Sequence, residues 1–91
     1  MSIAAPYDEL SILRRVIDPE KGNLTQAAAE AILRLDLDPR DRIRMQELLD
    51  KNRDGALTTD EDEELENYCR VGRFLDLMRS KARHSLQSTG A

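Results

Sequence analysis

Apolar residues recur at helical spacing in four segments of this chain, and polar or turn-forming residues separate the segments. The spacing predicts helices over about residues 6–17, 25–35, 39–51 and 59–86, followed by a disordered tail over 87–91. Each of the first three helices would bury one narrow apolar face. These faces are formed by Leu10, Leu13, Val16 and Ile17, by Ala28, Ala31, Ile32 and Leu35, and by Met45, Leu48 and Leu49.

Residues that cap helices stand at the predicted boundaries. Thr25 is placed to cap the second helix, and Asp38 followed by Pro39 is typical of the start of the third. The segments 22–25 and 55–58 repeat the order Gly-x-Leu-Thr between two helices. In both we predict that Gly adopts the left-handed conformation after one helix and that Thr caps the next.

The composition favours helices over sheets. Apolar residues make up 40% of the 91 residues but aromatic residues only 3%, so the core must consist of aliphatic side chains. Such a composition suits helices better than strands. We therefore predict an all-α fold, a four-helix small domain over residues 1–91 with a long C-terminal helix.

Charge and cysteine usage restrict the partners and the compartment. The net charge of −4 argues against nucleic-acid binding and fits a basic protein partner better. Cys69 is the single cysteine, which excludes an internal disulfide and favours a reducing compartment. No segment resembles a signal peptide or a membrane span. We expect a cytoplasmic protein that does not bind a membrane.

The predicted fourth helix has a wider apolar arc than one packing face requires. One interpretation buries the arc, including Cys69, within the chain's own bundle; the other shares it with a second chain in a homodimer. Gly72 lies in mid-helix and would permit a close helix crossing. The candidate interface residues are Leu65, Tyr68, Val71, Gly72, Phe74, Leu75, Met78 and Ala82.

The segment 50–61, DKNRDGALTTDE, matches the spacing of an EF-hand calcium loop. Its oxygen ligands would be Asp50, Asn52, Asp54, the carbonyl of Ala56, Thr58 and Glu61. The same residues also fit a capped turn, with Thr58 and Glu61 forming a capping box. We favour the capped turn because the flanking positions Asp62 and Glu66 are polar and because no second loop is present.

Much of the chain resembles a family of small uncharacterised bacterial helical proteins. The resemblance rests on five motifs, which are Ile17-Asp18-Pro19-x-x-Gly22-x-Leu24-Thr25, Arg44-Met45-x-Glu47-Leu48, Arg53-x-Gly55-x-Leu57-Thr58, Glu64-Leu65-x-x-Tyr68-x-Arg70-Val71-Gly72, and Leu75-x-x-Met78-x-Ser80-Lys81-Ala82-Arg83-x-Ser85-Leu86. Members are often encoded beside a small HNH-type nuclease. The resemblance implies a role as a partner or antitoxin-like inhibitor of such a nuclease. The first calcium ligand of the loop is typically not Asp in this family, so the calcium match at Asp50 would be accidental.

No arrangement of residues in the sequence indicates catalysis. His84 stands alone near the end of the last helix, with no Cys or Asp at a spacing typical of a catalytic triad. We therefore predict a non-enzymatic protein–protein interaction module. The alternatives are a calcium-binding protein with a single EF-hand-like loop and a small nucleic-acid-associated protein that uses basic residues of the last helix.

Overall fold

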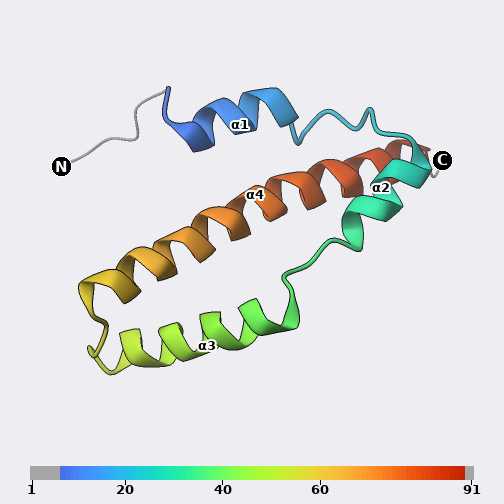
Figure 1. Ribbon diagram of the computed structural model, residues 1–91. Coiled ribbons are helices and arrows are strands. Elements are labelled where there is room, and N and C mark those ends of the chain that lie inside the picture. The colour runs from blue at the N-terminus through green and yellow to red at the C-terminus, as the bar shows by residue number, and fades with distance from the viewer. Residues whose placement is uncertain (1–6, 90–91) are drawn as a thin grey trace. The chain divides into compact units, whose positions relative to one another are not determined.

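The computed structural model describes residues 7–89 and contains four helices (Figure 1). Helix α1 spans Glu9–Ile17, α2 Gln26–Leu33, α3 Pro39–Arg53 and α4 Thr59–Thr89. The described residues include no strand. The all-α prediction, with four helices and a long C-terminal helix, is confirmed.

The helix boundaries differ from the predicted ones by a few residues. Helix α1 begins at Glu9 because the Asp8 carboxylate accepts a hydrogen bond of 2.9 Å from the Ser11 amide; the expected start at Pro6 lies outside the described residues. Helix α2 ends at Leu33, and α3 continues to Arg53. Helix α4 continues to Thr89, so residues 87–89 of the expected disordered tail are helical, and residues 90–91 lie outside the description.

The predicted caps of α2 and α3 are confirmed. The Thr25 hydroxyl accepts a hydrogen bond of 3.1 Å from the Ala28 amide. The Asp38 carboxylate accepts one of 2.9 Å from the Arg40 amide, with Pro39 in the first turn. These bonds satisfy amides that lack a partner within the helix.

The chain divides into two compact units. Unit 1 comprises Met1–Leu35 and Arg73–Ala91, and unit 2 comprises Asp36–Gly72. Unit 2 therefore contains α3 and the first part of α4, whereas unit 1 contains α1, α2 and the rest of α4. The single domain expected from the sequence remains a prediction.

In unit 1 the loop between α1 and α2 lies directly on α4. A Cβ atom added to Gly22 would lie 2.6 Å from the backbone oxygen of His84. The Ser85 hydroxyl, which is fully buried, accepts a hydrogen bond of 3.1 Å from the Leu24 amide. The Lys81 ammonium donates to the carbonyls of Asp18 and Lys21 at 3.2 and 3.0 Å. Unit 1 is therefore held by close backbone approach and by hydrogen bonds to loop carbonyls and amides.

The prediction for Gly22 was wrong in one respect. The left-handed residue after α1 is Asp18, with φ of 50°, and Gly22 has no positive φ. Gly22 is instead the residue without a side chain that the contact with α4 requires. Gly55, with φ of 68°, does adopt the predicted left-handed conformation.

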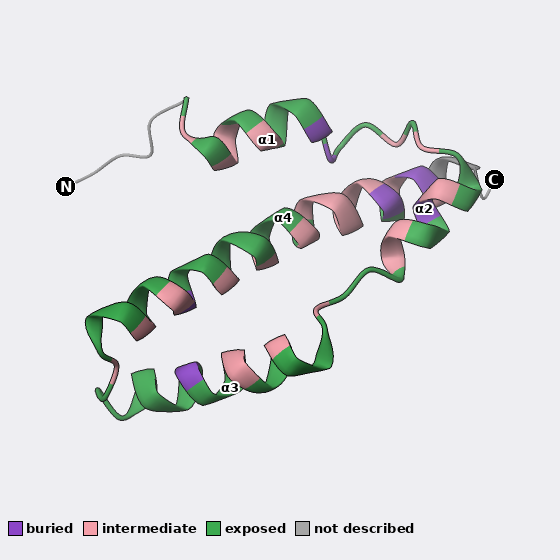
Figure 2. Ribbon diagram, in the orientation of Figure 1, coloured by how far each residue is buried: buried purple, intermediate pink, exposed green. Residues whose placement is uncertain are grey.

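In unit 2, α3 runs antiparallel to the first part of α4 (Figure 1). The buried apolar residues of the described part of this unit are Leu48 in α3 and Leu65 in α4. Figure 2 colours buried positions purple along each helix. The Arg44 guanidinium donates to both oxygens of Glu64, at 2.5 and 3.0 Å. This two-point ion pair raises the pKa of Arg44 and lowers that of Glu64.

Several side chains expected in the core are exposed. Val16 is 76% exposed, and Leu35 and Leu49 are 49% and 38% exposed. Ala31 is also exposed, while its neighbour Ala29 is buried. Part of the apolar face predicted for each of α1, α2 and α3 therefore lies in solvent.

Candidate functional site

The segment 50–61 does not form a loop along its whole length. Helix α3 continues through Arg53, so Asp50 and Asn52 belong to its last turn. Residues two apart in a helix point about 200° away from each other. Asp54 is the C-cap, and Gly55 then turns the chain with its positive φ. The first two ligand positions are therefore directed apart rather than toward a common centre.

The strongest candidate ligands already have partners. Asp50 accepts a hydrogen bond of 3.0 Å from the side-chain amide of Gln46 and forms an ion pair with Arg53. One oxygen of Glu61 lies 2.5 Å from the Lys51 ammonium, and the other accepts a hydrogen bond of 3.1 Å from the Thr58 amide. The ion pair with Lys51 and the bond from Thr58 lower the pKa of Glu61 to about 2.

The capping box at the start of α4 is confirmed. The Thr58 hydroxyl accepts a hydrogen bond of 3.1 Å from the Glu61 amide, and the Glu61 carboxylate accepts the reciprocal bond from the Thr58 amide. Two of the six predicted calcium ligands, Thr58 and Glu61, are thus hydrogen-bonded to each other. Within residues 7–89, no three His, Cys, Asp or Glu side chains are grouped so that they could hold a metal ion.

The predicted interface residues of α4 fall into three groups. Leu65 and Ala82 are buried within their own units, and Tyr68 donates a hydrogen bond of 2.8 Å to Asp41. Val71 and Phe74 are exposed, by 46% and 36%. The remaining members, Gly72, Leu75 and Met78, are half-buried.

One expectation about α4 needs correction. Cys69 is exposed, although the apolar arc predicted a buried position. A Cβ atom added to Gly72 would meet no atom of the described chain within 4 Å, and a close crossing with a second chain at this residue stays a prediction. Part of the apolar arc of α4 is exposed, including Val71 and Phe74.

The two units carry opposite charge. Unit 2 has twelve carboxylates and six basic side chains, a net charge of −6, whereas unit 1 has six carboxylates and eight basic side chains. Four carboxylates at the start of α4 are exposed, and none of them has an ion-pair or hydrogen-bond partner within the described chain. They are Asp60, Asp62, Glu63 and Glu66. The modest overall charge of −4 therefore conceals a strongly acidic unit.

Sequence reasoning missed the pairing of Asp41 with Tyr68. The two residues are 27 positions apart, and the bond between them exists only because α3 lies against α4. His84 was assigned no role, but its Nδ1 atom lies 2.8 Å from the Pro19 carbonyl oxygen and helps to hold the loop of unit 1. No local motif signals either contact.

The described helices include none that is both long enough and apolar enough to span a membrane. Comparisons of the chain with family models, with curated proteins and with solved structures found no match.

Proposed function

We propose that this protein is a non-enzymatic interaction module whose acidic unit 2 binds a basic protein partner in the cytoplasm. The observation that carries the proposal is the charge of unit 2, where carboxylates outnumber basic side chains two to one. Three exposed carboxylates at the start of α4, those of Asp60, Asp62 and Glu63, form no ion pair with any described residue and are available to a partner's cations.

Physical chemistry favours a protein over a nucleic acid as the partner. A clustered negative field attracts a basic surface and accelerates its association, whereas it repels phosphates. Asp60, Asp62 and Glu63 form no ion pair with any described residue, so a partner's cations need not displace an existing ion pair at these carboxylates. These points support a basic protein and disfavour nucleic acid for unit 2.

The family resemblance supplies a specific candidate for the partner. A small HNH-type nuclease needs a cationic surface to hold nucleic-acid phosphates. An acidic unit that covers this surface would inhibit the nuclease by competing with its substrate. The antitoxin-like role implied by the resemblance is therefore consistent with the charge of unit 2.

The proposal is tested by co-expressing the tagged chain with a small HNH-type nuclease of the kind encoded beside members of the family that the chain resembles. We expect the two proteins to elute as one complex in size-exclusion chromatography and expect nuclease activity to fall as the chain approaches a stoichiometric amount. High salt should dissociate the complex because exposed charge pairs are screened. Separate elution at low salt, together with full nuclease activity, would contradict the proposal for this partner.

Self-association is a second candidate, favoured by the exposed apolar residues of α1. Ile12 and Val16 are one turn apart on the same face and are 45% and 76% exposed. A homodimer that covers such residues would raise the melting temperature as protein concentration rises. Light scattering should then give twice the monomer mass of 10.4 kDa. The monomer mass at every concentration would exclude this candidate.

A further inference from the structure

Unit 2 has a surface hollow between the start of α3 and the segment of α4 that belongs to the same unit. The hollow has a volume of about 360 Å³ and combines apolar walls with an acidic edge. Its lining residues are Leu37, Asp41, Glu64, Asn67, Tyr68 and Val71. Val71 is 46% exposed and Leu37 is half-buried, so both offer apolar surface to an incoming group.

Of the two carboxylates that line the hollow, one forms an ion pair with a basic side chain and the other forms none with any described residue. Both oxygens of Glu64 accept hydrogen bonds from Arg44, so its charge is neutralised. Asp41 forms no ion pair with any described residue, and it accepts a hydrogen bond through Oδ1 from the Tyr68 hydroxyl at 2.8 Å. This bond, with the negative charge of Asp41, raises the pKa of Tyr68. Asp41 is thus an uncompensated carboxylate that Tyr68 holds in place.

We infer that this hollow receives an arginine side chain of the basic partner. The aliphatic stem would lie against Leu37 and Val71, and the guanidinium would donate to Asp41. The volume is near the lower limit of about 300–1,000 Å³ that small-molecule pockets occupy, which suits a single side chain. Arginine fits better than lysine because its weakly hydrated planar head tolerates a partly apolar site. The inference rests on the proposed function and names the group that unit 2 recognises.

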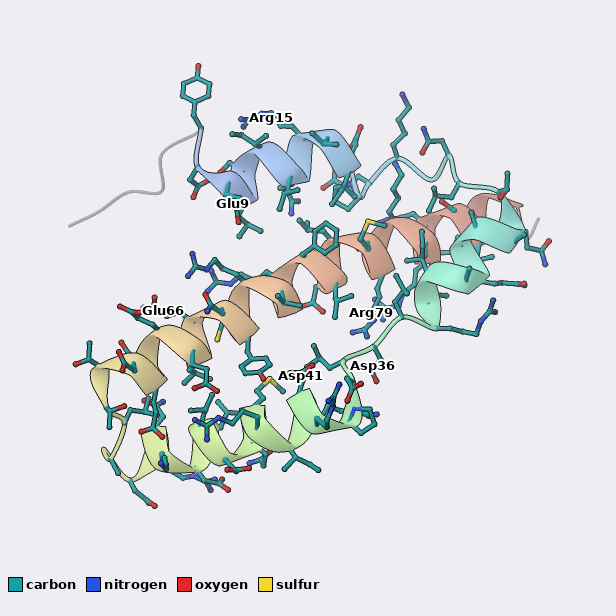
Figure 3. The ribbon with its side chains drawn as sticks, viewed as in Figure 1. Glu9, Arg15, Asp36, Asp41, Glu66 and Arg79 are labelled. Carbon is teal, nitrogen blue, oxygen red and sulfur yellow. The ribbon has the colours of Figure 1, made fainter. Side chains whose placement is uncertain are left out.

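The chain contains a matched control for Asp41. Figure 3 shows Asp41 directed from the start of α3 toward α4, and Glu66 directed away from α3 on the other side of α4. Glu66 is an exposed carboxylate of the same unit and has no ion-pair partner within residues 7–89. Asp41→Asn and Glu66→Gln remove one negative charge each, but only the first removes a charge from the lining of the hollow.

The test uses two fluorescently labelled ten-residue peptides at physiological salt. One contains three Leu-Arg pairs separated by Gly-Ser, and the other has citrulline in place of arginine. We expect the citrulline peptide to bind the full chain at least about tenfold more weakly because citrulline carries no charge. Asp41→Asn should weaken binding of the arginine peptide about five- to tenfold, whereas Glu66→Gln should change it less than about twofold.

A second variant and a second measurement cover the case in which Asp41→Asn does not fold. Tyr68→Phe keeps the ring but removes the hydroxyl that holds Asp41, and we expect it to weaken binding about two- to threefold. In an NMR titration of the unaltered chain, the arginine peptide should shift the amide signals of Asp41, Tyr68 and Val71 more than that of Glu66.

The outcomes separate the inference from the proposed function. Equal effects of Asp41→Asn and Glu66→Gln, or the largest amide shifts outside the hollow, would overturn the inference but leave unit 2 as an acidic binding surface. Binding of neither peptide would overturn the inference, and the nuclease experiment would still decide the function.

Discussion

In unit 1 the Gly-x-Leu-Thr segment at Gly22 lies against the backbone of α4, whereas the segment at Gly55 in unit 2 turns through open space. A Cβ atom at Gly22 would approach the His84 carbonyl oxygen to 2.6 Å, but one at Gly55 would meet no atom within 4 Å. Only Gly55 has a positive φ. The same residue type in the same local pattern therefore serves close packing in one turn and backbone conformation in the other.

The polar contacts of the two turns differ in the same way. In unit 1 the Leu24 amide donates to Ser85, a residue 61 positions away. In unit 2 Thr58 and Glu61 form a capping box within a single helical turn. The turn in unit 1 therefore depends on tertiary packing, whereas the turn in unit 2 is stabilised by contacts within its own sequence.

Gly22→Ala should have the largest effect on stability. The added methyl group would collide with a helix backbone that has little freedom to move, and the cost should reach roughly 3 kcal/mol, the upper end of the usual range for overpacking. For a chain of this size the melting temperature should fall by about 12–24 °C. Thermal denaturation followed by circular dichroism measures the change.

Gly72→Ala is the matched control for that substitution. Gly72 lies within α4, and its added Cβ would meet no atom within 4 Å. Alanine should therefore raise the unfolding free energy by about 0.5–1 kcal/mol through its better helix propensity. A loss of stability at Gly72 that matches the loss at Gly22 would contradict the assignment of close contact to Gly22.

Gly55→Ala should cost less than Gly22→Ala and for another reason. Its penalty of about 1 kcal/mol comes from the positive φ alone, because the surrounding space is open. Gly55→Asn should recover about half of the loss, since Asn tolerates the left-handed conformation. If Asn gives no recovery in urea denaturation, conformation is not what position 55 requires.

Glu61→Gln should change the stability of unit 2 mainly through its dependence on pH. The pKa of Glu61 is lowered from 4.5 to about 2, so its ionised form stabilises the folded state above pH 4.5. That contribution disappears as the pH falls toward 2. The melting temperature of the unaltered chain should therefore decline more steeply over this interval than that of the variant. Glu63→Gln, at an exposed residue without an ion pair, serves as control, and equal slopes for both variants would refute the role of Glu61.

Calcium should have the smallest effect, because the candidate ligands of segment 50–61 are directed apart or occupied. We expect millimolar Ca²⁺ to leave the melting temperature unchanged. A functional site would instead add about 2.7 kcal/mol at a hundredfold excess of ion over its dissociation constant. A rise in melting temperature that Glu61→Gln abolishes would show that Asp50, Asn52, Asp54 and Glu61 rearrange to bind calcium.

The elements of this fold could be predicted from local signals. The helices follow from apolar spacing, and Thr25, Asp38 and Thr58 cap them through hydrogen bonds to residues two or three positions away. Such bonds depend on the sequence within one turn. The positive φ of Gly55 is also a local property of the turn.

The contacts that distinguish the two units could not be predicted in this way. The approach of Gly22 to α4 and the bond between Asp41 and Tyr68 join residues far apart in the sequence. The exposure of Val16 and Cys69 depends on how many helices cover each face, which periodicity does not specify. The net charge of unit 2 is not apparent from the composition, because the total charge of the chain is the sum of two units with opposite net charge.

The central claim is that unit 2, and not unit 1, provides the binding surface for a basic partner. The most direct test measures the affinity of the HNH-type nuclease for two doubly neutralised chains at physiological salt. Asp60→Asn with Glu63→Gln alters unit 2. Glu9→Gln with Asp76→Asn removes the same charge from exposed positions of unit 1 that form no ion pair with any described residue. We predict about tenfold weaker binding for the first chain and an unchanged affinity for the second. Equal losses, or a larger loss for the unit 1 variant, would contradict the claim.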